Sequence, residues 1–234
     1  MATVNSFGNE KKENTGKKLE YFIGNNRKIL IAIIAIIVLV AVALCVAFAV
    51  SESGIKKGLA AVDAIEFSFV KDSDGLDEAA ATERRETALK ELAAYTTKEN
   101  VVGVRANMLS ADISFQKEDY SAAAAFYLAA ADCGEDSYTA PLCFFNAAVS
   151  YEQAGNNKDA VKYYEKASEY KDFLRRTHAI FSAGRVSESL QDFEGAKKFY
   201  STLEEKYPSD SWTDIAKTRL ISLKIAGKSN SFKK

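Results

Sequence analysis

The sequence offers few side chains that could carry out chemistry on a ligand. His178 is the sole histidine, so one chain cannot supply a two-histidine metal site. Cys133 and Cys143 could form a disulfide outside the cytoplasm or remain free thiols, and their spacing leaves both alternatives open. No glycine-rich phosphate loop follows a strand, because no segment shows the period-two pattern of a strand. We therefore expect a protein that is not an enzyme and that uses no metal or other cofactor.

Composition also limits the class of partner. The 31 Lys and Arg residues nearly balance the 32 Asp and Glu residues, and neither half of the chain has the basic stripe typical of nucleic-acid binding. The charged run Glu83–Glu86 is expected to solvate a helix face, and the tyrosines at helical spacing are expected in the core. The expected partners are proteins, with no nucleic acid and no small-molecule substrate.

One long apolar run stands near the beginning of the sequence. Ile29–Val50 has 22 residues without a charge or a proline. As a helix it would be about 33 Å long, enough to cross a hydrocarbon core of about 30 Å. Ala47-Phe48-Ala49 could be a signal-peptidase site, so a cleavable signal peptide is the alternative. The length of the run and the polar segment before it favour an uncleaved anchor.

Lysine and arginine residues near the ends of this run predict its orientation. Before it lie Lys11, Lys12, Lys17, Lys18, Arg27 and Lys28. The first two basic residues after it, Lys56 and Lys57, share their stretch with Glu52. By the positive-inside rule, we expect residues 1–28 to be a cytoplasmic tail, residues 29–50 a single transmembrane helix, and the remainder an extracytoplasmic domain.

Beyond the span the pattern predicts only helices. Apolar residues at helical spacing predict a helix over 52–71, namely Ile55, Leu59, Val62, Ile65 and Phe69. A second helix is predicted over 76–97, with Leu89 and Leu92 on its buried face. Together they form a degenerate pair within residues 51–103. At the other end, residues 209–234 should hold a capping helix that stops at Gly227, followed by a tail.

Between these ends the sequence repeats with a period of 36 or 37 residues. One column of the repeat holds Ala123, Ala160 and Ala196. Four residues later come Tyr127, Tyr164 and Tyr200, and twelve residues earlier come Ala111, Ala148 and Gly184. Small side chains at these places would let two antiparallel helices approach closely, and such a period is the mark of a helical solenoid.

This pattern resembles the tetratricopeptide repeat (TPR), a family of helical hairpins, over residues 104–208 in three units. The middle unit fits best, at Phe144, Ala147, Ala148, Tyr151, Ala160, Tyr164 and Ala167. The first unit departs at Asn107 and Ser114, and the third at Ser187. The resemblance implies an all-α fold, in which a TPR-type α-solenoid follows the transmembrane helix.

In such a solenoid the first helix of each unit lines the inner wall. The fifth positions of these helices hold Met108, Phe145 and Phe181, and the ninth positions hold Asp112, Val149 and Arg185. These six residues are the candidate binding site for a peptide partner. The alternative is that the apolar members pack in the core. The Lys, Asn and Arg set with which some TPR modules capture a C-terminal carboxylate is missing here.

The order of parts resembles the YfgM family of bacterial inner-membrane TPR proteins. Two segments carry the likeness, LEYFIGNNRKILIAIIAIIVLV and VRANMLSADISFQKEDYSAAAAFYLAAA. The resemblance implies an inner-membrane protein with a periplasmic TPR domain, associated with the Sec translocon and with periplasmic chaperones that receive exported polypeptides. A TPR scaffold in cell-envelope assembly, for outer-membrane biogenesis or cell division, is the alternative function.

Overall fold

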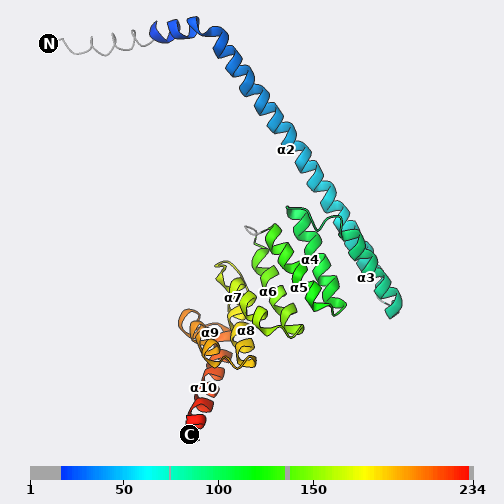
Figure 1. Ribbon diagram of the computed structural model, residues 1–234, viewed down its shortest axis with the longest axis vertical. Helices are drawn as coiled ribbons and strands as arrows, with labels where there is room; N and C mark the ends of the chain where they lie inside the picture. Colours follow the sequence, from blue (N-terminus) through cyan, green and yellow to red (C-terminus); the bar gives the residue numbers. More distant parts are fainter. Residues whose placement is uncertain (1–16, 74, 135–137, 232–234) are drawn as a thin grey trace, which may run out of the picture. The chain divides into compact units, whose positions relative to one another are not determined.

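The computed structural model describes residues 17–73, 75–134 and 138–231, and it divides into two units at Gly54 and Ile55. Residues 1–16, most of the predicted tail, lie outside the described part. Within the described part the chain consists of helices joined by turns (Figure 1). Residues 17–25 are helical, and the labelled helices that follow are α2 (Arg27–Val70), α3 (Glu78–Leu92), α4 (Val101–Gln116), α5 (Tyr120–Cys133), α6 (Ala140–Gln153), α7 (Asn157–Glu169), α8 (Arg176–Ser189), α9 (Phe193–Lys206) and α10 (Ser211–Ser231).

The first unit holds the apolar part of α2. Among the described residues, α2 is the one helix long and apolar enough to cross a membrane, with a mean hydropathy of 3.6 in its most apolar window. None of that window is buried against protein. The helix predicted from residue 52 is the continuation of α2, because no proline or helix-ending turn separates it from the apolar run.

The second unit begins with residues 55–70 of α2, which pack against α3 and α4. Val62 and Leu92 are fully buried there, as the apolar spacing predicts. Helix α3 is shorter than predicted. It begins where Asp77 accepts a hydrogen bond from the Ala80 amide at 2.8 Å, and it ends at Leu92. The buried Asn107 of α4 explains one departure from the usual repeat. Its side chain donates to the Thr96 carbonyl and so attaches the loop between α3 and α4 to α4.

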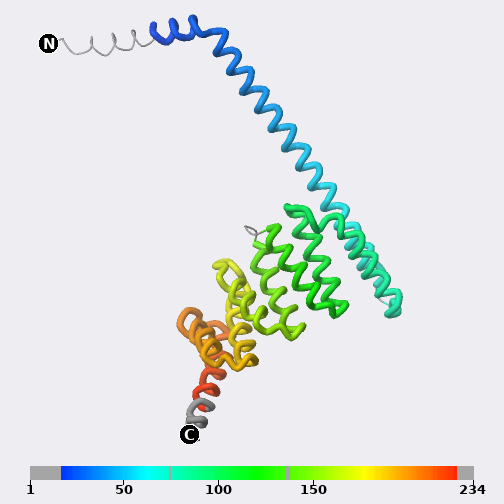
Figure 2. The backbone as a smooth tube through the Cα atoms, viewed as in Figure 1, coloured from blue at the N-terminus to red at the C-terminus, as the bar shows by residue number. Residues whose placement is uncertain are grey.

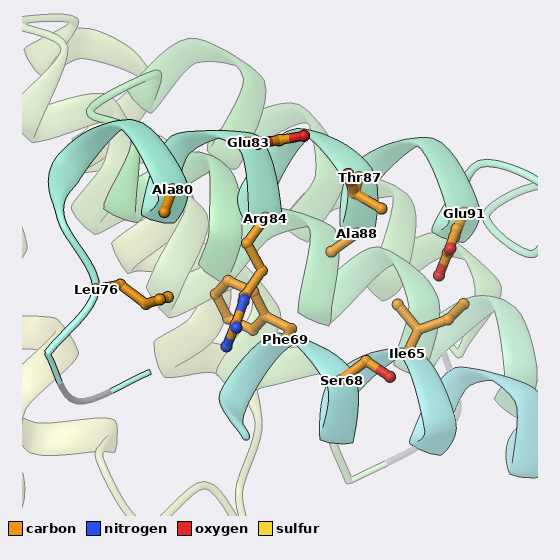
Figure 3. A pocket seen from close by; sticks show the side chains of 10 residues that line it. All are labelled: Ile65, Ser68, Phe69, Leu76, Ala80, Glu83, Arg84, Thr87, Ala88 and Glu91. Carbon is orange, nitrogen blue, oxygen red and sulfur yellow. The ribbon is translucent and has the colours of Figure 1, made fainter. Parts of the chain in front are cut away.

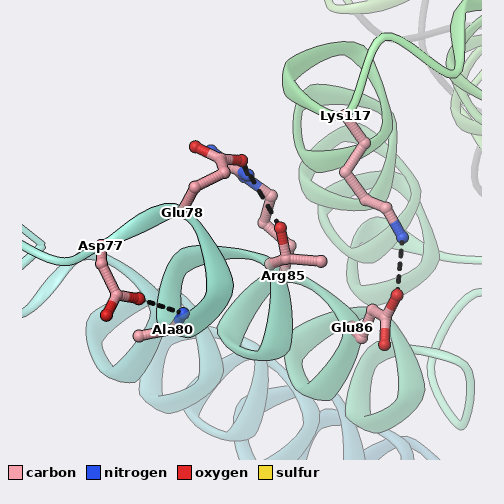
Figure 4. A network of polar contacts seen from close by, with 7 residues as sticks. Asp77, Glu78, Ala80, Arg85, Glu86 and Lys117 are labelled. Carbon is pink, nitrogen blue, oxygen red and sulfur yellow. Dashed lines mark hydrogen bonds and ion pairs between the residues drawn. The ribbon is translucent and has the colours of Figure 1, made fainter.

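The charged run on α3 solvates that helix and also connects it to α4. Arg85 pairs with Glu78 at 2.9 Å, and Glu86 pairs with Lys117 at the end of α4 at 3.5 Å (Figure 4). Both carboxylates are largely exposed, so these ion pairs contribute little to stability.

Three hairpins follow, α4–α5, α6–α7 and α8–α9, and α10 packs on the last of them (Figure 2). Each hairpin turns through one residue in the left-handed region, with φ of 59° at Glu118, 75° at Gly155 and 61° at Gln191. Glycine occupies this place in the middle hairpin, whereas the other two turns use residues with side chains. The residue after each one, Asp119, Asn156 or Asp192, caps the second helix with its side chain.

The two helices of each hairpin cross at the small residues that the period predicts. Ala111, Ala123, Ala148, Ala160 and Ala196 have no exposed surface. Gly184 lies so close to the buried Tyr200 that an added Cβ would be 2.6 Å from the Cε1 atom of the ring. The crossing is therefore tightest in the third hairpin, where only glycine fits without a shift of its neighbour.

Helix α10 corrects one prediction. It was expected to stop at Gly227, but it continues to Ser231. A glycine lowers helix stability by about 1 kcal/mol relative to alanine, which weakens a helix without ending it.

We expect Gly184→Ala to lower the free energy of unfolding by about 1–2 kcal/mol, because the new methyl group overpacks against Tyr200 by more than helix propensity returns. Urea unfolding of the full chain in detergent, followed by circular dichroism, measures this change. In a Tyr200→Leu background the same substitution should cost much less. An equal cost in both backgrounds would contradict the steric explanation.

Candidate functional site

The first helices of the three hairpins, α4, α6 and α8, together with the C-terminal helix α10, form one wall of the array. Phe145 of α6 contacts His178 of α8 with 5.1 Å between ring centroids. His178 in turn stacks on Trp212 of α10 at 4.1 Å, with the two rings nearly parallel. Ala111 of α4 and Ala147 of α6 belong to one buried cluster. These contacts bring the six predicted binding residues to neighbouring helices.

Two of those six residues are in the core. Phe145 is 3% exposed and meets Tyr164 edge-on at 5.3 Å. Phe181 is 6% exposed and packs against Tyr200 and Trp212. The alternative of core packing therefore describes both phenylalanines. Their rings hold α6 and α8 to the helices behind them, and they present little surface to a partner.

The other two apolar candidates keep part of their surface. Met108 and Val149 are half-buried and pack against the edge of the central core cluster. They lie on adjacent first helices, α4 and α6. The partly exposed apolar surface of the wall is thus found at the junction of the first and second hairpins.

Arg185 binds Glu152, a residue that the repeat pattern did not identify as a candidate. Its guanidinium makes two hydrogen bonds to the Glu152 carboxylate, at 2.5 and 2.7 Å, from α8 to α6. The Tyr164 hydroxyl donates to the same carboxylate at 3.1 Å. Burial alone would raise the pKa of Glu152, but the Arg185 hydrogen bonds and charge outweigh it, so this pKa lies below its usual value.

The same arrangement recurs one hairpin later. The Tyr200 hydroxyl donates to Glu188 at 2.5 Å, and Arg219 of α10 lies 3.6 Å from that carboxylate. Glu152 and Glu188 each follow the small residue of the first helix by four positions, so the period did contain a signal for them. It was missed because acidic residues on helices usually face solvent.

Asp112 differs from both glutamates. It accepts a hydrogen bond from the Tyr127 hydroxyl, and no basic side chain of the described part of the chain pairs with it. Burial raises its pKa above the usual value, and the charge of Glu66 raises it further, although the Tyr127 hydrogen bond opposes this shift. Asp112 is therefore a carboxylate on the wall without a compensating cation.

The remaining candidates for chemistry have structural explanations. Of the two alternatives left open for Cys133 and Cys143, the structure has free thiols, and burial together with the charge of Asp112 raises the pKa of Cys143 to about 12. Burial and the charges of Arg175 and Arg185 lower the pKa of His178. Across the described residues, no three His, Cys, Asp or Glu side chains gather in a way that could hold a metal ion.

A cavity of about 390 Å³ lies away from the wall, between the end of α2 and α3 (Figure 3). Its apolar lining includes Ile65, Phe69 and Leu76, and Arg84 beside them donates to the Lys71 carbonyl. The lining includes no nucleophile activated by a base and no metal-binding set. It is a gap between two helices, as far as the described residues line it.

Comparisons with known proteins agree with this architecture. Two tetratricopeptide-repeat family models match residues 75–138 and 143–172, which include most of α3 to α7. A protein of Treponema pallidum (strain Nichols), named TPR repeat-containing protein, is 31% identical over 117 residues, covering 50% of this chain and 49% of that protein. The chain thus spans about half the length of this curated relative. The fold is all-helical with TPR repeats, and TPR repeats are protein–protein interaction modules.

The two kinds of carboxylate should respond differently to substitution. Glu152→Gln should lower the free energy of unfolding at neutral pH by about 1–2 kcal/mol, because it removes the charge that Arg185 and Tyr164 share. Asp112→Asn should leave it within about 0.5 kcal/mol or raise it, since it removes an uncompensated charge and keeps an acceptor for Tyr127.

The pH dependence of urea unfolding checks these assignments. A carboxylate with a lowered pKa contributes stability above its unfolded value, 4.5 for Glu152, and loses it as the pH falls through the folded value. The stability difference between the original chain and Glu152→Gln should therefore disappear in acid. For Asp112, with a raised pKa, ionisation costs stability. Any gain in stability from Asp112→Asn should therefore also disappear in acid, where Asp112 of the original chain is protonated in both the folded and the unfolded state. A loss of stability in Asp112→Asn at neutral pH would contradict its assignment as uncompensated.

Proposed function

We propose that this chain is a membrane-anchored binding module that assists protein export or chaperone hand-off at the Sec translocon. The observation that carries the proposal is the combination of two parts in one chain. One is an apolar helix whose most apolar window has no protein packed on it, and the other is an array of TPR repeats. Such an array binds polypeptides and needs no catalytic residues.

The anchor supplies a physical advantage for a weak binding surface. Attachment to a bilayer confines the repeats to a thin layer beside the membrane, which raises their effective concentration for any partner held there. Contacts too weak for capture from solution then suffice. An exported polypeptide that emerges beside the anchor is a partner of this kind.

Two features support the proposed place and orientation. The basic residues before the apolar run favour a cytoplasmic N-terminus, which puts the repeats outside the inner membrane. The resemblance to the YfgM family supports the translocon and periplasmic chaperones as partners.

Accessibility of single cysteines tests the orientation. In a chain with Cys45 and Cys133 replaced by Ala, Lys171→Cys in the exposed turn after α7 should react with a membrane-impermeant thiol reagent applied outside the inner membrane. Glu20→Cys, before the apolar run, should react only after that membrane is broken. The buried Cys143 stays unreactive in both. The reverse pattern of labelling would place the repeats in the cytoplasm.

Photo-crosslinking in intact cells tests the partner. A benzoylphenylalanine in place of Met108 on the wall should crosslink to translocon subunits, a periplasmic chaperone or exported chains. The same residue in place of Lys198, exposed on the second helix α9, is the matched control and should give much less of these products. Recovery of only outer-membrane or division proteins from Met108 would instead favour a scaffold of envelope assembly.

A further inference from the structure

The array has three junctions. The first joins hairpin α4–α5 to hairpin α6–α7, the second joins α6–α7 to α8–α9, and the third joins α8–α9 to α10. A tyrosine hydroxyl lies at each of them. At the second junction, the Tyr164 hydroxyl donates to Glu152 of α6 at 3.1 Å, while Arg185 of α8 binds the same carboxylate. At the third, the Tyr200 hydroxyl donates to Glu188, and Arg219 of α10 forms an ion pair with the same carboxylate at 3.6 Å. Each carboxylate thus has one tyrosine hydroxyl and one guanidinium beside it, and the guanidinium comes from the next helix of the wall.

The first junction has the tyrosine and the carboxylate but lacks the guanidinium. Tyr127 donates to Asp112, which lies one turn earlier on its helix than the two glutamates do on theirs. Phe115 occupies the place that the period gives to an acid, and it cannot accept a hydrogen bond. The carboxylate of Asp112 nevertheless accepts from the tyrosine of its hairpin, as the carboxylates of Glu152 and Glu188 do at their own junctions.

The neighbouring first helix shows which residue is missing. At the second junction Ser182 interacts with the Tyr164 hydroxyl, and Arg185 follows three residues later. At the first junction Asn146 interacts in the same way with Tyr127, and Val149 follows three residues later. Val149 therefore stands at the first junction where Arg185 stands at the second, and the first is the junction whose carboxylate has no cation among the described residues.

No other charge of the described residues takes over this role. The basic residues nearest to Asp112 in sequence are both paired elsewhere. Lys117, at the end of α4, lies 3.5 Å from Glu86 of α3, and Arg105 is held by Asp63 and Glu66 of α2 at 2.7 Å each. Glu66 adds negative potential at Asp112 rather than relieving it. Met108, one turn before Asp112 on α4, and Val149 on α6 are half-buried apolar side chains of the same wall.

We infer that Asp112, Met108 and Val149 form a docking surface for a polypeptide segment in which one arginine or lysine is flanked by apolar residues. The cation takes the place that Arg185 and Arg219 fill at the other junctions, and the apolar neighbours cover Met108 and Val149. This inference rests on the proposed function as a polypeptide-binding module, and it restricts the binding site to the first junction. The second and third junctions are closed to such a segment, because their carboxylates are already paired.

Capped peptide pools can test this preference on the full chain in lipid nanodiscs. Each peptide carries a central arginine between apolar residues that include photoleucine, and a second pool replaces the arginine by neutral citrulline of the same shape. We expect the arginine pool to give about fivefold more crosslinks to α4 and α6, as a partly exposed ion pair would provide.

Three variants make the test specific. Asp112→Asn keeps an acceptor for Tyr127 and should remove the preference for arginine. Val149→Arg supplies the missing guanidinium within the chain and should remove it as well. Glu204→Gln neutralises an exposed acid of α9 and should leave it unchanged.

Four results would overturn the inference: equal capture of both pools, an undiminished preference in Asp112→Asn, crosslinks that map to other helices, or no capture of either pool. The cellular crosslink from Met108 is independent of all four. If that crosslink finds an export partner while the arginine preference fails, the proposed function stands and the inference falls. If the preference holds while no export partner is found, the chemistry of the surface stands and the proposed function falls.

Discussion

The close approach of two helices at small side chains is the constraint on which the repeat array depends. Ala111, Ala148 and Gly184 let the second helix of each hairpin come so near that its tyrosine lies across the first helix with its ring fully enclosed. The buried ring then directs a hydroxyl toward the wall. A buried hydroxyl needs a hydrogen-bond acceptor, because leaving one unmade costs about 1–3 kcal/mol. The small residues thus determine where the wall must place its carboxylates.

Those carboxylates in turn determine which parts of the wall remain available. Glu152 and Glu188 are satisfied by arginines from the next helix, so two junctions are closed by contacts of the array with itself. Asp112 accepts a hydrogen bond from its tyrosine, has no arginine beside it among the described residues, and is exposed to solvent. One fold therefore contains two junctions whose carboxylates are paired within the chain and one whose carboxylate is not, which is the junction where we infer a docking surface. The wall is better described junction by junction than as one continuous surface.

The sequence predicted the parts of the fold that depend on burial. Small residues and tyrosines recur with the period because each must occupy the same enclosed volume, and Val62, Leu89 and Leu92 follow helical spacing for the same reason.

The sequence did not predict which wall residues are exposed. Phe145 and Phe181 occupy the same repeat position as Met108, but aromatic rings from neighbouring helices cover them. The Glu152–Arg185 pair was also missed, because it joins residues 33 positions apart in two neighbouring hairpins. Helix ends at Gly227 and near residue 51 were misjudged because a weak helix former does not by itself end a helix.

The left-handed turns have a consequence for how the chain folds. Each turn closes through hydrogen bonds between residues only three to five positions apart, such as the Asp119 amide to the Ser114 carbonyl at 3.0 Å. The following residue caps the next helix from its own side chain. Every turn can therefore form from its own residues, and the outer face of a packed hairpin is then a template for the next hairpin. Such local encoding favours rapid, stepwise folding, in which the array grows from one formed hairpin as more of the chain becomes free.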